Sequence, residues 1–118
     1  MICEYLWGQI PAEVKPRFVG DIPSQSEEGI SLSIQDGAET TTFLGQEEAL
    51  YRPYVQCFVR NEDYQKGDGF VDKVVKALDK FHDDTILSCL MVGYPTYLGL
   101  NEDKLHEFQI VFQLIVKE

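Results

Sequence analysis

The side chains that could do chemistry here are two histidines, three cysteines and many carboxylates. His82 is followed by Asp83 and Asp84, a combination that can bind a metal ion or transfer protons. His106 stands beside Glu107, but nothing in the sequence brings it near His82 or a cysteine, and the spacing of a zinc site is absent. We therefore interpret residues 82–84 as polar residues at the C-terminal end of a helix, where a histidine suits the helix dipole.

Motifs for nucleophilic catalysis and phosphate binding are also missing. The glycines lack the GxxxxGKS/T and GxGxxG spacings, and no serine stands in a nucleophile elbow. Cys3, Cys57 and Cys89 form an odd set without CxxC spacing, which favours reduced thiols in a cytoplasmic setting. We interpret Cys57 and Cys89 as small buried hydrophobic residues. The sequence therefore predicts no enzyme activity, no cofactor and no metal.

Length and charge limit the function further. The 118 residues, 44% hydrophobic and 25% charged, are expected to form a single domain over residues 1–118. No stretch is long and apolar enough for a membrane span, and residues 1–10 do not form a secretory signal. A formal charge of -10 argues against a nucleic-acid footprint, because phosphate contacts need clustered Lys and Arg. The acidity suits a surface past which DNA moves without sticking, or it serves solubility alone.

The strand pattern is dominated by the stretch from Glu107 to Lys117. Apolar residues recur there at every second position, which predicts a long half-buried strand. The same pattern predicts strands over Gly29–Gln35 and Pro53–Arg60, and the second should be central because large apolar groups lie on both of its faces. Shorter strands are expected at Val14–Val19, Thr85–Val92 and Thr96–Leu98.

Two helices are expected to cover this sheet. Ile2 to Gln9 predicts a short helix, and Asp68 is a good N-cap for a longer one from about Gly69 to His82. The long helix has an apolar stripe at helical spacing, formed by Phe70, Val71, Val74, Val75, Leu78 and Phe81. The predicted fold class is α+β, with a mainly antiparallel sheet of four to six strands and one long and one short helix packed on one face.

Residues 36–51 are predicted to form a flexible arm or loop. They open with an Asp36-Gly37 turn signal and have too little apolar content for a core, although Thr40–Leu44 could extend as the limb of a hairpin. Loops of this length are usually functional or disordered.

Arg60 and the tyrosines are candidates for contacts between chains. Arg60 ends a central strand and is followed by Asp63 and Tyr64, so its guanidinium could pair with a carboxylate or stack on an aromatic ring at a subunit boundary. A solvated strand end is the alternative. Four further tyrosines suit either an interface or the core: Tyr51, Tyr54, Tyr94 and Tyr97.

Three segments together resemble tail-terminator or tail-completion proteins, which are minor capsid proteins of tailed bacteriophages. They are GISLSIQDGAETTTFLG, RPYVQCFVRNEDYQKG and YLGLNEDKLHEFQIVFQLIVKE, so the resemblance runs from about Gly29 to the C-terminus. The matching features are a strand with Gln56 and Arg60, a turn with Tyr64, a helix that ends in Leu78 and Phe81, and a late H-E-x-Q strand from His106 to Gln109. The sequence departs from the family at its start, where related proteins often carry a fuller first helix.

The resemblance implies a virion structural protein of the head-tail junction that caps the tail tube and joins it to the head connector. The implied partners are copies of itself in a ring, expected to be a hexamer, together with tail-tube and head-connector proteins, while DNA passes through the ring. The ring would be made in the bacterial host cytoplasm and carried in the virion. On this basis we expect Arg60, Tyr64 and Tyr54 near a subunit contact, and Glu39, Glu47 and Glu48 facing the channel or a partner.

Two other functions remain open at this point. One is a cytoplasmic, non-enzymatic module that binds a small ligand or peptide in a cleft near Tyr94 and Tyr97. The other is a small hydrolase, which would require His82, His106, Cys89 and an acid to come together.

Overall fold

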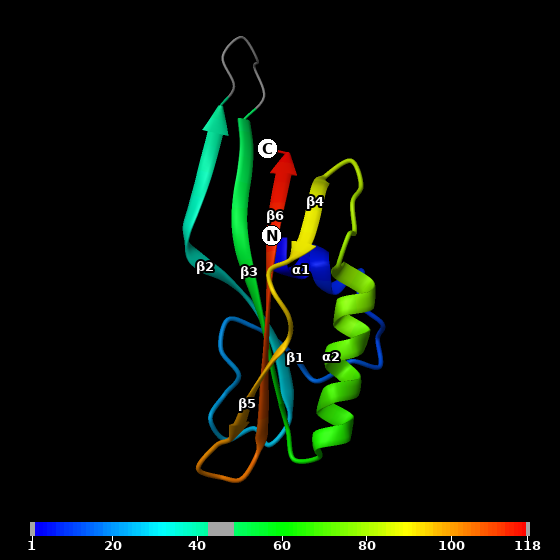
Figure 1. Ribbon diagram of the computed structural model, residues 1–118, viewed down its shortest axis with the longest axis vertical. Coiled ribbons are helices and arrows are strands. Elements are labelled where there is room, and N and C mark those ends of the chain that lie inside the picture. The colour runs from blue at the N-terminus through cyan, green and yellow to red at the C-terminus, as the bar shows by residue number, and fades with distance from the viewer. Residues whose placement is uncertain (1, 43–48, 118) are drawn as a thin grey trace.

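The computed structural model describes residues 2–42 and 49–117, with side chains described for residues 2–35 and 51–117. In chain order the elements are α1 (Ile2–Trp7), β1 (Arg17–Val19), β2 (Gly29–Thr42), β3 (Ala49–Asn61), α2 (Tyr64–Leu78), β4 (Ile86–Met91), β5 (Thr96–Leu100) and β6 (His106–Lys117) (Figure 1). No helix in these residues is long and apolar enough to cross a membrane.

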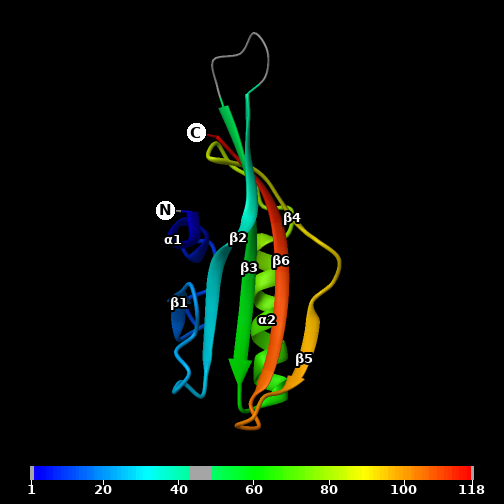
Figure 2. The same cartoon turned by 90° about the vertical axis from the view of Figure 1, so that its left-hand side faces the viewer.

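The six strands form one sheet in the order β1-β2-β3-β6-β4, and β5 also pairs with β6. All pairs are antiparallel except β1 with β2. Strands β4 and β5 lie one after the other along the same edge of β6: β4 pairs with residues 112–116 and β5 with residues 106–109 (Figure 2). Together they act as one edge strand that residues 92–95 interrupt. The predicted α+β class with a mainly antiparallel sheet is confirmed.

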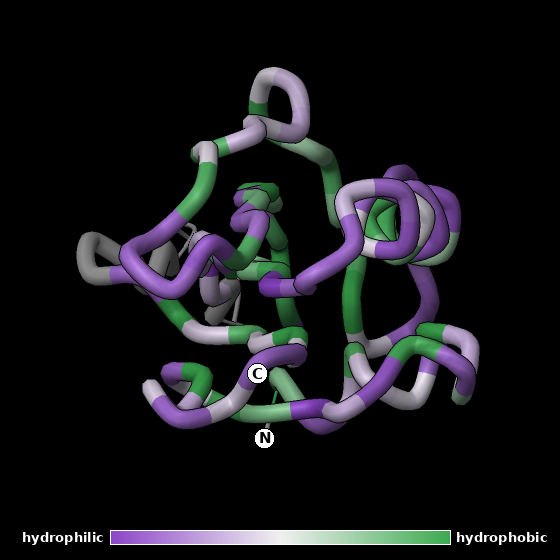
Figure 3. Tube along the Cα trace, turned by 90° about the horizontal axis from the view of Figure 1, so that it is seen from below, coloured by the Kyte–Doolittle hydropathy of each residue, from purple (hydrophilic) through white to green (hydrophobic). Residues whose placement is uncertain are grey.

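One face of the sheet is buried beneath the helices. Alternate residues of the central strands point to this face, as the period-two pattern requires: Ile30, Leu32, Val55, Cys57, Val59, Phe108, Ile110, Phe112, Leu114 and Val116. Leu6 and Trp7 of α1 and Val71, Val74 and Leu78 of α2 belong to the same core. Viewed along the long axis, α2 stands on one side of the sheet (Figure 3). The other face carries mostly polar side chains.

Helix α2 begins and ends earlier than predicted. Asp63, not Asp68, is the N-cap: its side chain accepts a hydrogen bond from the Gln65 N–H, and the Asn61 side chain accepts one from the Asp63 N–H. The helix therefore includes Gly67, although glycine is a poor helix former. The packing of Phe108 requires glycine at position 67, because a Cβ atom at Gly67 would lie 2.7 Å from Cε1 of Phe108.

The helix ends at Leu78 because the chain turns away after it. Asp79 has an extended backbone, and Lys80 adopts a left-handed conformation with φ of 68°. His82, Asp83 and Asp84 thus lie in the connection to β4 rather than in the last turn of the helix. The Asp83 side chain accepts hydrogen bonds from the N–H groups of Thr85 and Ile86, which starts β4.

The prediction of a loop over residues 36–51 needs correcting at both ends. Strand β2 continues through Asp36 and Gly37 to Thr42, and β3 already begins at Ala49. The register between β2 and β3 shifts between Gln35 and Glu39, where Asp36 and Gly37 lie. The chain therefore continues along β2 and does not turn back at Asp36 and Gly37. Residues 43–48 lie outside the described residues.

Strand β1 is shorter than the predicted Val14–Val19, because a side chain holds the preceding segment in place. The Arg17 guanidinium donates hydrogen bonds of 2.7 to 3.0 Å to the carbonyl oxygens of Trp7, Ile10, Pro11 and Val14. This leaves three residues to pair with β2, and β1 is an edge strand, where the preceding Pro16 costs no ladder hydrogen bond.

Candidate functional site

The residues of the hydrolase hypothesis do not come together. His106 pairs in register with Leu100 and Asn61 at one end of β6, whereas Cys89 pairs with Leu114 toward the other end. Cys89 is buried, and burial raises its pKa to about 12, so its thiol is not a ready nucleophile. Among the residues that the structure describes, no group of three or more His, Cys, Asp or Glu side chains could hold a metal ion.

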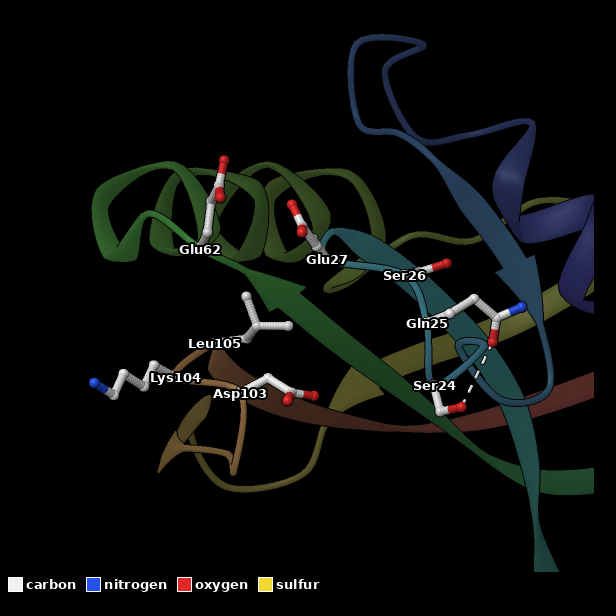
Figure 4. A pocket seen from close by; sticks show the side chains of 8 residues that line it. All are labelled: Ser24, Gln25, Ser26, Glu27, Glu62, Asp103, Lys104 and Leu105. Atoms are coloured by element: carbon white, nitrogen blue, oxygen red, sulfur yellow. Dashed lines mark hydrogen bonds between the residues drawn. The ribbon is translucent and has the colours of Figure 1, made fainter.

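Tyr94 and Tyr97 do not line the well-formed hollows of the described surface. Five such hollows have volumes of 230 to 420 Å³, and neither tyrosine lines any of these five. One of the largest, about 420 Å³, lies between loops at one end of the sheet (Figure 4). Its wall is mostly polar and includes three carboxylates: Ser24, Gln25, Ser26, Glu27, Glu62, Asp103, Lys104 and Leu105. Small-molecule sites are usually lined by apolar side chains, so this hollow does not favour one.

The main concentration of exposed apolar side chains lies along β4, residues 92–95 and β5. We call this set the hydrophobic edge: Leu87, Leu90, Val92, Tyr94, Tyr97, Leu98 and Leu100, which are 43 to 86% exposed. Residues 85–100 contain no charged residue, although 25% of the chain is charged. Natural edge strands usually carry charges that prevent pairing with another chain. An uncharged, apolar edge is therefore a candidate protein contact.

The two halves of this edge differ in their backbone groups. Beside β4, the Lys80 N–H donates to the Cys89 carbonyl oxygen at 2.7 Å, and the Met91 N–H donates to the Asp79 carboxylate at 3.0 Å. The segment that follows α2 thus covers the outer side of β4 (Figure 1). Strand β5 pairs only with β6 among the described residues, and it stands at the right-hand border of the sheet in Figure 2. Strand β5 is the half of the edge that can accept another strand.

An aromatic cluster holds β5 against the start of α2. The rings of Tyr64 and Tyr97 meet edge to face with centroids 5.1 Å apart, and both contact the buried ring of Phe108. The Tyr97 hydroxyl lies 2.7 Å from Nδ1 of His106, close enough for a hydrogen bond. Tyr64 remains 44% exposed, so it extends the hydrophobic edge onto α2.

Arg60 is used within the chain. Its Nε lies 3.2 Å from the Glu107 carboxylate, and its Nη1 donates to the carbonyl oxygens of Pro23 and Ser26. The carboxylate that Arg60 pairs with belongs to its own chain, and the bonds to Pro23 and Ser26 fasten the loop of residues 20–28 to the sheet. A role for Arg60 at a subunit contact stays a prediction.

The other predicted site residues lie apart from one another. Tyr54 lies half-buried on the uncovered face of the sheet, in register with Gln35 and Gln113, whereas Tyr64 adjoins the hydrophobic edge. Glu39 is in β2, paired in register with Arg52, and its side chain is not described. Glu47 and Glu48 lie outside the described residues. The sequence singled out Tyr94 and Tyr97 but missed the leucines beside them, for which the charge-free run of residues 85–100 was the available signal.

A second unpaired edge lies on the opposite side of the sheet. Beyond Leu32, β2 pairs only with β3 among the described residues, so the outer side of residues 33–42 is open. Val19 and Ile34 are 54% and 42% exposed there. They line a mostly apolar cavity of about 260 Å³ together with Ile2, Cys3, Glu4, Gly20 and Ser33.

Comparison with known proteins gives a family match and a structural likeness. The model of the family described as bacteriophage tail terminator protein matches residues 5–118. A chain from the virion of a native gene transfer agent particle is similar in fold, with a TM-score of 0.58 and 10% identity over 99% of this chain and 85% of that chain. No match is found among curated proteins.

Proposed function

Because this chain belongs to the bacteriophage tail terminator family, we propose that it forms a ring that caps the tail tube and joins it to the head connector. Membership gives it a structural role at the head-tail end of a virion. The finer role rests on one observation, the hydrophobic edge of an otherwise acidic subunit. An edge of this kind is a common site of contact with another protein chain.

We propose six copies in the ring, a number taken from the family resemblance alone. The work of such a ring is mechanical: it ends tube growth by occupying the last tube subunits, and it offers its other face to the connector. Synthesis in the host cytoplasm, followed by incorporation into the virion, belongs to the same proposal.

The proposal includes an acidic channel. Each copy carries a formal charge of -10, and a ring multiplies that charge around its axis. Like charge keeps DNA from binding to the wall while it passes. Glu39, Glu47 and Glu48 are the carboxylates proposed to face the channel or a partner protein. Of these three, Glu39 is in β2 close to the end of the sheet where β6 finishes, since Thr41 pairs with Leu50 and Leu50 with Lys117.

The experiment is genetic complementation of a phage genome that lacks this gene. Electron micrographs of the lysate should show filled heads and separate tails, many of abnormal length, and expression of the wild-type chain should restore joined virions. A triple replacement, Glu39→Lys, Glu47→Lys and Glu48→Lys, should leave folding unchanged but reduce joining or DNA ejection. Normal virions without the gene would contradict the terminator role. Normal joining and ejection with the triple variant would contradict only the acidic channel.

A further inference from the structure

We infer that neighbouring copies join by strand addition, with β5 of one copy pairing with the open edge of β2, residues 33–42, of the next. The inference rests on the proposed ring and names the surfaces that build it. It commits to one occupant of the β5 half of the hydrophobic edge, which is a second copy of this chain.

The first argument is that the two open edges lie on opposite sides of one sheet. Among the described strands, β5 has no neighbour outside it, and β2 has none beyond Leu32. A contact between two different surfaces of identical subunits is heterologous, and such contacts generate rings when the rotation closes. Pairing of β5 with β5 would instead give a two-fold dimer and leave β2 open.

The second argument is strand direction. Strand β2 is antiparallel to β3, β3 to β6, and β6 to β5, so β5 runs antiparallel to β2 within one subunit. A neighbour related by rotation in a continued sheet keeps the same strand directions. The contact between β5 and the next β2 is therefore antiparallel, which is the more stable of the two pairing patterns.

The third argument is the stagger between the edges. Strand β5 lies level with residues 106–109 of β6. Through β3, Ser33 lies level with Val111 and Thr41 with Lys117, so the open part of β2 is displaced toward the other end of the sheet. A sheet that closes around an axis needs strands that are tilted and staggered in this way.

The fourth argument is charge, and it favours a second copy over another partner. Two copies that each carry -10 repel one another wherever their carboxylates approach. Residues 85–100 contain no charged residue, and within residues 33–42 only Asp36 and Glu39 are charged. A contact between β5 and this edge brings few carboxylates together, whereas a basic partner would be drawn to the acidic loops instead.

The fifth argument is complementary shape. Leu98 and Leu100 of β5 are 48% and 58% exposed. On the other side of the molecule, the cavity beside Val19 and Ile34 offers an apolar recess of about 260 Å³. An apolar side chain that enters such a recess is the usual centre of a stable interface.

The test uses one variant for each edge. Leu98→Asp damages the β5 edge and Ile34→Asp damages the β2 edge, and both positions are exposed, so folding should be unaffected, as circular dichroism and urea unfolding would verify. Leu100→Asp and Val19→Asp form a second pair in case either first variant unfolds. Leu87→Asp is the matched control, since its exposure is similar but it lies on β4, whose outer backbone groups are already bonded.

Light scattering should show a monomer for each edge variant alone, with the apparent dissociation constant raised by about 30-fold or more. An equimolar mixture of the two edge variants should form one-to-one dimers and nothing larger, because each dimer retains one intact contact. Leu87→Asp should assemble like the wild type.

The other outcomes separate the two proposals. Wild-type rings that persist in both edge variants would overturn the strand addition and leave the ring standing. A monomeric Leu98→Asp beside an Ile34→Asp that still associates would show β5 pairing with itself, which also overturns the inference. A wild-type chain that stays monomeric at all concentrations would remove the ring itself.

Discussion

Tyr64, the first residue of α2, meets Tyr97 of β5 edge to face, with ring centroids 5.1 Å apart and an interplanar angle of 80°. This contact joins the long helix to the strand that carries the hydrophobic edge. It makes Tyr97 part of the fold and of the exposed surface at once, whereas Tyr94, 86% exposed, belongs to the surface alone.

The two tyrosines should therefore respond differently to truncation. Tyr94→Ala is expected to change the free energy of unfolding by less than about 0.5 kcal/mol, because it removes no packed group. Tyr97→Ala should cost about 1 to 2 kcal/mol through the lost ring contacts and the lost hydrogen bond to His106. Both should weaken self-association. Urea unfolding and light scattering on the same samples separate the two effects, and unchanged association in Tyr94→Ala would argue against a contact at residues 92–95.

Gly67 and Gly69 offer a matched pair within α2. At Gly69 a Cβ would meet nothing within 4 Å, so Gly69→Ala should stabilise the protein by about 0.5 to 1 kcal/mol through helix propensity and a less flexible unfolded chain. At Gly67 the same atom would lie 2.7 Å from the buried Phe108 ring, and Gly67→Ala should destabilise by about 1 kcal/mol or more. The urea midpoints of the two variants should move in opposite directions. A rise in both would mean that Phe108 can shift.

Arg60 should matter for the stability of a single chain. Its side chain is only 14% exposed and that of Glu107 19%, so Arg60→Met leaves a largely buried carboxylate without its cation and frees the loop of residues 20–28. We expect a loss of about 2 kcal/mol and faster proteolysis within that loop. Lys66→Met is the control, because the exposed Lys66–Glu28 pair should contribute less than about 0.5 kcal/mol. Equal effects of the two substitutions would contradict this role for Arg60.

Asp83 should contribute to the pH dependence of stability. The hydrogen bond from Tyr5, followed by those from the backbone N–H groups of Ile86 and Thr85, lowers the pKa of its carboxyl below the ordinary 3.8. A lowered folded-state pKa gives stability that is present above 3.8 and lost as the pH falls through the folded value. Asp83→Asn should therefore destabilise at neutral pH, and the difference from the wild type should shrink in strong acid. Urea midpoints across the acid range test this.

Tyr5→Phe provides the control for this effect. It removes the largest cause of the shift, so an NMR titration should place the pKa of Asp83 nearer its ordinary value. An unchanged titration curve would mean that the backbone donors alone set the shift.

The sequence predicted those parts of the fold that depend on local pattern. The alternation of apolar and polar residues in Glu107–Lys117 and Pro53–Arg60 correctly predicted β6 and a central β3. This alternation can be recognised without knowing which strands lie beside it. The start of α2 was missed because glycine is a poor helix former, and only the packing of Phe108 on Gly67 makes it the right residue there. The Asp36-Gly37 turn signal failed because pairing with β3 overrides it.

The candidate site was harder to predict for a related reason. An apolar run such as residues 86–91 looks the same in a central strand and at an edge, and only the pairing pattern shows which side stays open. Arg60 had chemistry that suggested an interface, yet Pro23, Ser26 and Glu107 take up its donors. These partner residues are present in the sequence, but the sequence alone does not show that they lie close to Arg60.

The central claim is that this chain acts by assembling into a ring, and the mass of the purified protein tests it most directly. Light scattering after size exclusion, over a wide concentration range, should show a closed species of defined mass, expected to be six copies of 13.5 kDa, and negative-stain images should show rings. A single mass of one chain at every concentration would contradict the account.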